Sequence, residues 1–139
     1  MANLSLKQKV RYVPNIPGNR AAPEAEQISL SITAGLSSLE VAAVMRAVNE
    51  AVEAVAKDDQ KAGELITAAL ASAVELNPTS TTVDGAEVQT LAQYVDAVLL
   101  KQRGGSLFGE LVREVNRVNS VEGERELFFG PSSGTATTP

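Results

Sequence analysis

The side chains best suited to acid–base or metal chemistry in this chain of 139 residues are carboxylates, because it contains no His and no Cys. Those absences exclude Ser-His-Asp triads, histidine metal ligands and thiolate metal sites. Two acidic groups remain, one formed by Asp58, Asp59 and Glu64 and one by Glu110 and Glu114. The first lacks the ligand spacing of an EF-hand, and the second has no His to complete a di-metal bundle. We expect no metal, no cofactor and no enzymatic activity.

Structural roles account for both groups. Acidic residues suit the start of a helix, where the helix dipole favours negative charge. Glu110 and Glu114 each precede an arginine by three residues, Arg113 and Arg117, which predicts ion pairs on the wet side of a helix. The pair Gly104-Gly105 lacks the Lys-Ser or Lys-Thr of a phosphate-binding loop and is typical of a helix end.

The overall charge is acidic, with 12 Lys and Arg against 17 Asp and Glu, a net charge of −5. Nucleic-acid-binding proteins usually have a basic face. The densest basic run, Lys7, Lys9 and Arg11, adjoins only one aromatic residue, Tyr12, and is typical of an edge strand. No apolar run approaches the roughly 18 residues of a membrane span, and the N-terminus lacks a signal-peptide core. We expect no nucleic-acid or membrane binding and a cytoplasmic location.

The hydrophobic period changes near residue 36. Apolar and polar residues alternate around Val10 and Tyr12 and again around Leu30 and Ile32. Alternation of this kind predicts two strands, each with one buried face. The Pro- and Gly-containing stretch between them predicts a loop. A two-stranded antiparallel ribbon is marginal by itself, so we expect it to pack on helices or on another chain.

Helical spacing and capping signals follow. Capping boxes at Ser37–Glu40 and Thr90–Gln93 each open an apolar helical stripe. Residues 37–75 form one bent helix or two, and Asp84-Gly85 predicts a hairpin turn. Ser106 caps an amphipathic helix, and a short last helix begins at Asn119 and runs through 128.

The predicted fold class is α+β and mostly helical, with an N-terminal two-stranded β-ribbon followed by four to five helices. We expect a single domain over residues 1–129, with ribbon and loop in 1–35 and helices in 36–129. Residues 130–139 are Gly, Pro, Ser, Thr and Ala, which predicts a flexible tail, disordered unless a partner orders it.

All three phenylalanines lie in the last third of the chain. Phe108 falls in the clearest amphipathic helix, whereas Phe128 and Phe129 adjoin the tail. Two interpretations stay open for the latter pair. They form a hydrophobic clasp covered by their own chain, or they form a contact patch for another protein.

Three ordered motifs in the first part of the chain carry a family resemblance. They are Arg11-Tyr12-Val13-Pro14, Gly18-Asn19-Arg20 and Pro23-Glu24-Ala25-Glu26-Gln27-Ile28. Together with Val83-Asp84-Gly85-Ala86-Glu87-Val88 and the helix from Leu107 to Asn119, they resemble tail assembly chaperones of long-tailed (siphovirus-type) bacteriophages. The resemblance covers roughly residues 9–130 and departs at Ala21-Ala22, where a bulkier or acidic pair is expected.

The resemblance implies a function. Such chaperones bind the tape measure protein and keep it soluble in the host cytoplasm before the tail tube polymerises, and they are typically absent from the mature virion. A frameshifted longer form often recruits the tail tube protein. The alternative is a structural subunit of the phage tail or of the head-to-tail connector. The oligomeric state is left open by the sequence.

A chaperone for a helical client needs a groove between amphipathic helices. The clustering of the phenylalanines beside the clearest amphipathic helix suggests where this groove lies. We expect the following residues at or near it: Leu107, Phe108, Leu111, Val112, Val115, Phe128 and Phe129.

Overall fold

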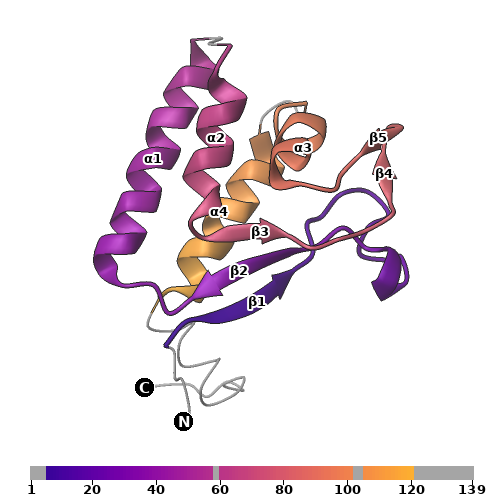
Figure 1. The fold of residues 1–139 in the computed structure, drawn as a ribbon, viewed down its shortest axis with the longest axis horizontal. Coiled ribbons are helices and arrows are strands. Elements are labelled where there is room, and N and C mark those ends of the chain that lie inside the picture. Colours follow the sequence, from indigo (N-terminus) through magenta and orange to yellow (C-terminus); the bar gives the residue numbers. More distant parts are fainter. Residues whose placement is uncertain (1–5, 58–59, 102–104, 121–139) are drawn as a thin grey trace.

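The computed structural model describes residues 6–57, 60–101 and 105–120, and within them an antiparallel sheet lies beside four helices (Figure 1). The sheet has the strand order β1 (Gln8–Tyr12), β2 (Leu30–Ala34) and β3 (Val74–Leu76). The α+β class is confirmed. The N-terminal ribbon is three-stranded rather than two-stranded, because a later segment of the chain pairs with β2.

Alternation gives the sheet one apolar and one polar face. Val10 pairs with Ile32 and Tyr12 pairs with Leu30, so these four side chains share a face. Leu30 and Ile32 are fully buried. The opposite face carries polar side chains, namely Lys9, Arg11, Ser31 and Thr33. The helices pack on the apolar face, and α4 passes behind β2 and β3 in Figure 1.

β3 corrects the prediction that residues 36–129 are helical. Val74 pairs with Ile32 and Leu76 pairs with Leu30, which extends the apolar face by two residues. A short apolar segment fits a helical period and a strand period equally well. The segment becomes a strand because the free edge of β2 offers hydrogen-bond partners to its backbone N–H and C=O groups.

Residues 37–75 hold two helices and the start of β3 rather than one bent helix. α1 (Ser38–Ala56) and α2 (Ala62–Ala71) stand side by side in Figure 1. The predicted capping box is confirmed, since Ser37 Oγ accepts from Glu40 N and Glu40 Oε1 accepts from Ser37 N. It fixes where α1 begins, and from there α1 packs against α2.

The predicted hairpin turn at Asp84-Gly85 is confirmed. β4 (Thr82–Val83) and β5 (Ala86–Glu87) pair across it. Asp84 and Gly85 both have positive φ, 50° and 81°, as a primed two-residue turn requires. A 3-10 turn, η1 (Glu24–Glu26), lies in the long loop between β1 and β2.

The last third of the described chain contains α3 (Leu91–Tyr94), the π-helical segment η2 (Val95–Leu99) and α4 (Ser106–Val118). The capping box of Thr90 and Gln93 is confirmed. Gly105, with φ 63°, is the N-cap of α4, so Ser106 is its first residue rather than its cap. Apart from Asn119 and Ser120, the expected last short helix lies outside the described residues, as does the tail 130–139.

Asn119 fixes the end of α4 against the sheet. Its Nδ2 donates to Thr33 O at 3.0 Å, and its Oδ1 accepts from Leu36 N at 2.9 Å. The same side chain therefore holds α4 next to β2 and next to the start of α1. Within the described ranges, no helix is both long and apolar enough to cross a membrane.

Candidate partner-binding groove

An open apolar groove lies between α1 and α4, with a volume of about 570 Å³. α1 contributes Val48, Val52 and Val55 to one wall, and α4 contributes Phe108 and Val112 to the other. Aliphatic side chains make most of both walls, and the ring of Phe108 and the amide of Asn49 are the exceptions among the lining side chains. The groove can therefore accept an apolar side chain or a helix stripe without needing one fixed shape.

Several groove residues are apolar and yet exposed. Val52 is 45% exposed, Val55 44% and Leu100 39%. The valine stripe of α1 thus divides, because Val44 and Val48 reach the core while the last two valines stay open to solvent. Contiguous exposed apolar side chains on a small chain are typical of an interaction surface.

The hypothesis for α4 is corrected in part. Leu107 is 6% exposed and Leu111 and Val115 are fully buried, so these three residues belong to the core rather than to the groove. They recur every four residues and face the sheet, whereas Phe108 and Val112 are one position further round the helix and line the groove. Phe128 and Phe129 lie outside the described residues.

The π-helical segment η2 closes the groove at its α2 side. Leu99 and Leu100, at its end, both line the groove. α2 packs closely here, since a Cβ on Gly63 would lie 3.2 Å from Leu100 Cδ1 and 3.0 Å from Asp96 Oδ1. Sequence reasoning missed this wall, because one extra residue in a helical turn leaves no signal in the hydrophobic period.

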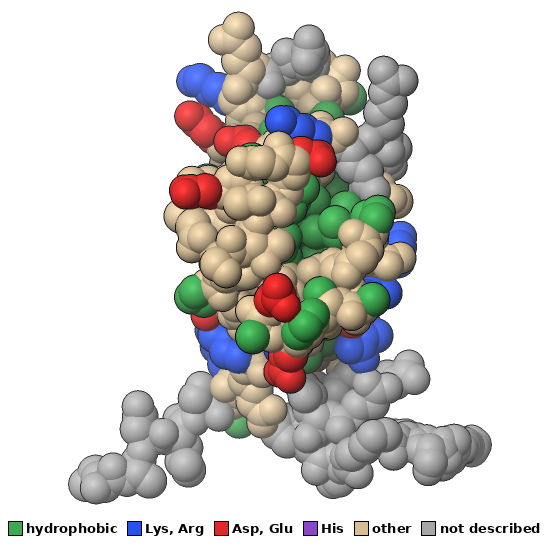
Figure 2. Space-filling view, turned by 90° about the vertical axis from the view of Figure 1, so that its right-hand side faces the viewer, with side chains coloured by type: hydrophobic (Ala, Val, Ile, Leu, Met, Phe, Trp, Pro, Cys, Tyr) green, Lys and Arg blue, Asp and Glu red, His purple; other side chains and the backbone are tan. Residues whose placement is uncertain are grey.

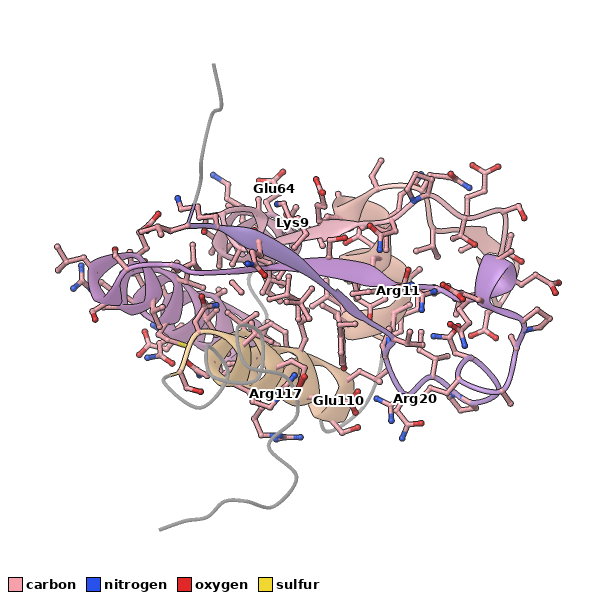
Figure 3. The ribbon with its side chains drawn as sticks, turned by 90° about the horizontal axis from the view of Figure 1, so that it is seen from below. Lys9, Arg11, Arg20, Glu64, Glu110 and Arg117 are labelled. Atoms are coloured by element: carbon pink, nitrogen blue, oxygen red, sulfur yellow. The ribbon has the colours of Figure 1, made fainter. Side chains whose placement is uncertain are left out.

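A polar cluster around Glu110 holds the other side of α4. Glu110 Oε1 accepts from the Tyr12 hydroxyl, from Asn15 N at 3.3 Å and from Arg20 Nη2 at 2.9 Å. Figure 3 shows Arg20 and Glu110 meeting from the loop and from α4. Glu110 is therefore paired with Arg20 rather than with the predicted Arg113. Burial, and then the hydrogen bond to Glu110, raise the pKa of Tyr12.

The predicted ion pair of Glu114 with Arg117 is confirmed at 2.8 Å. It is partly exposed and joins residues of one helix turn, so it contributes little to stability. The long-range pair of Glu110 with Arg20 has the larger structural effect, because it connects α4 to the loop that follows β1.

Asn19 organises that loop from within. Its Nδ2 donates to Pro14 O and to Ile28 O, and its Oδ1 accepts from Ile28 N at 2.8 Å. Gly18 has φ 83°, which favours glycine. In the Gly18-Asn19-Arg20 motif, the glycine thus makes the turn, the asparagine cross-links the loop from within, and the arginine pairs with Glu110.

No family model matches this chain, and neither a curated protein nor a solved structure is similar enough to count as a match. The site is therefore characterised by its own geometry.

The basic residues near the N-terminus are bound to the protein itself. Lys7 pairs with Glu40 at 2.9 Å and Lys9 donates to Thr33 Oγ1 at 3.0 Å. Tyr12 is 7% exposed, so its ring is not available for stacking on a base.

Acidic residues do not converge on a metal site within the described ranges, where no group of three or more His, Cys, Asp or Glu side chains could hold an ion. Glu64 is described and exposed, but Asp58 and Asp59 lie outside these ranges.

On the face viewed in Figure 2, hydrophobic side chains gather in a hollow while charged side chains of both signs lie around it. This face thus offers an apolar contact site.

Proposed function

We propose that this chain is an assembly chaperone of a long-tailed bacteriophage and that it holds an apolar helical stripe of the tape measure protein in the groove between α1 and α4. The observation that carries the proposal is the open groove, with Val52, Val55 and Leu100 exposed along it. The resemblance of the loop and hairpin motifs to tail assembly chaperones supports the identity of the client.

The groove suits a helical client physically. An amphipathic helix binds by laying side chains at three- and four-residue spacing into an apolar channel. The walls here are themselves helices whose groove residues, Val48, Val52 and Val55, have the same spacing. Burying each aliphatic side chain contributes about 1.5–3 kcal/mol at most, so several weak contacts give a reversible complex.

The charge of the chain supports a soluble complex. With a net charge of −5, several copies bound along one long client repel each other and resist aggregation. The proposal includes a role in the host cytoplasm, release before the virion matures and recruitment of the tail tube protein by a frameshifted longer form.

The test is co-expression with the tape measure protein of the same phage, followed by solubility and pull-down measurements. Val52→Lys places a charge in the groove without weakening helix propensity and should reduce co-purification at least about tenfold. Leu39→Lys is the matched control, because Leu39 is on α1, is 84% exposed and lies outside the groove. It should leave binding unchanged.

Two outcomes would contradict the proposal. Equal loss of binding in both lysine variants would show that the groove is not the contact. Failure of the unaltered protein to co-purify, together with its presence in purified virions, would instead favour the structural tail or connector subunit.

A further inference from the structure

We propose that one face of α1 binds the same face of a second copy of this chain, with the two helices antiparallel and Arg46 of each copy paired with Glu53 of the other. This face, the α1 stripe, consists of Met45, Asn49, Val52 and Ala56. The pairing does not depend on the proposed function, because no client takes part in it. It goes beyond that function by naming what covers the exposed Val52 when no client is bound.

The α1 stripe has the spacing of a helix–helix seam. Its members recur at steps of four, three and four residues, which keeps them on one side of the helix. Met45 is half-buried, because α4 reaches α1 at this point and Asn116 Nδ2 donates to Met45 Sδ at 3.4 Å. The other three members, Asn49, Val52 and Ala56, are exposed. From Asn49 onward the stripe is therefore open to a second helix.

Two charged residues flank the α1 stripe. Arg46 and Glu53 are exposed, and within the part of the chain that the structure describes neither takes part in an ion pair. They are two turns apart, beyond the steps of three and four residues at which side chains of one helix pair. Seven residues bring a helix back to within about 20° of the same direction, so both charges lie on the same border of the stripe.

An antiparallel arrangement brings these charges together. When the two-fold axis passes midway between Asn49 and Val52, Asn49 of one copy lies opposite Val52 of the other. The same register sets Arg46 of one copy beside Glu53 of the other, on the border of the seam where antiparallel helices form ion pairs. Symmetry repeats the pair, so the borders carry two ion pairs and no net charge. A parallel arrangement would instead place Glu53 beside Val48 and leave the charges unpaired.

The remaining positions of the α1 stripe suit the same register. Met45 lies opposite Ala56 of the second copy, so a long side chain faces a small one at each end of the seam. Asn49 is the one polar member, and a single polar residue in an apolar seam selects a register at a cost in affinity. We therefore expect a weak dimer that forms with rising concentration. Because Val52 and Asn49 also line the groove, the second copy and a client would compete for this wall.

The pairing can be tested by charge reversal in the full-length chain, with sedimentation equilibrium as the measurement. Arg46→Glu and Glu53→Arg each set two pairs of like charges against one another, so each should weaken dimerisation at least about tenfold. The double variant restores opposite charges and should return to within about threefold of the unaltered chain. Glu50→Arg is the matched control, because Glu50 is exposed on α1 but belongs neither to the stripe nor to its flanks. It should leave dimerisation unchanged.

Three outcomes would overturn the pairing. The first is a chain that stays monomeric up to about 1 mM. The second is a dimer whose affinity none of the charge reversals alters, and the third is a double variant that dimerises as weakly as either single variant. Circular dichroism verifies that every variant keeps its helices. Since sedimentation is measured without any client, a failed pull-down with the tape measure protein would reject the proposed function alone.

Discussion

The Tyr12 hydroxyl of β1 donates a hydrogen bond to Glu110 of α4, although 98 positions separate the two residues in the chain. The same carboxylate oxygen accepts from Asn15 N and from Arg20. One side chain thereby holds the edge strand, the long loop and the last described helix together. Because Glu110 lies between the groove residues Phe108 and Val112 in sequence, this cluster also sets the rotation of α4 that presents them.

Glu110→Ala should destabilise the protein by about 2 kcal/mol, because it leaves the nearly buried Tyr12 hydroxyl without its acceptor. Glu114→Ala, on the same helix, removes only the partly exposed pair with Arg117 and should cost less than about 0.5 kcal/mol. Chemical denaturation of both variants measures the difference. Equal effects would show that the Glu110 cluster does not hold α4.

The two tyrosines should respond oppositely to loss of their hydroxyl groups. Tyr94 is fully buried and its hydroxyl has no hydrogen-bond partner among the residues that the structure describes, so Tyr94→Phe should be neutral or stabilise the fold by up to about 1 kcal/mol. Tyr12→Phe removes a hydrogen bond to a carboxylate and should destabilise it by about 1–2 kcal/mol. Thermal unfolding of the pair checks the sign, and a clear loss of stability in Tyr94→Phe would contradict the assignment.

Gly35 at the end of β2 should be the least replaceable of the turn glycines. It has φ 83°, and a Cβ there would collide with the backbone carbonyl of Leu6. Gly85 has φ 81° but open space around it. We expect Gly85→Ala to cost about 1–2 kcal/mol from backbone strain and Gly35→Ala to cost more than that. Urea unfolding of both alanine variants provides the comparison, and equal costs would show that the contact with Leu6 is easily relieved.

The Glu40 carboxylate should make stability depend on acidity. The hydrogen bond from Lys7, and then the backbone N–H of Ser37, lower the pKa of Glu40 from 4.5 to about 2. A lowered pKa in the folded state means that the contribution is fully present above pH 4.5 and is lost as the pH falls toward 2. The stability difference between the wild type and Glu40→Gln should therefore shrink over this interval.

An NMR titration of the Glu40 carboxyl group gives the direct measurement. Lys7→Met should raise its pKa toward the usual value, and added salt should act in the same direction because the pair is exposed. A carboxyl pKa that is unchanged in Lys7→Met would show that the ammonium group is not the main cause.

Local signals predicted the elements that depend on neighbouring residues. The capping boxes of Ser37 and Thr90 and the turn at Asp84-Gly85 were predicted from the sequence and are confirmed. Each is a short-range arrangement in which a side chain or a positive φ satisfies nearby backbone groups. The amphipathic stripe of α4 was equally visible, because its polar and apolar residues separate with helical period.

The position of the groove could not be predicted from the apolar stripe of α4 alone. Leu111 and Val112 are both apolar neighbours on α4, yet the first is fully buried and the second lines the groove. Successive residues of a helix point 100° apart, so one can face the core while the next faces the surface. The placement of the sheet against the helix decides which of the two is buried. On α1, Val48 and Val52 both line the groove, yet Val48 is buried and Val52, one turn later, is 45% exposed.

The sequence by itself therefore determined the local elements, the acidic character and the absence of His and Cys, since these follow from residue types and short spacings. The tertiary structure alone decided that Val74–Leu76 pairs with β2 and that Glu110 meets Tyr12 and Arg20. It also decided which apolar residues stay exposed. These outcomes depend on contacts between residues far apart in the chain, where many arrangements share the same local pattern and packing selects one.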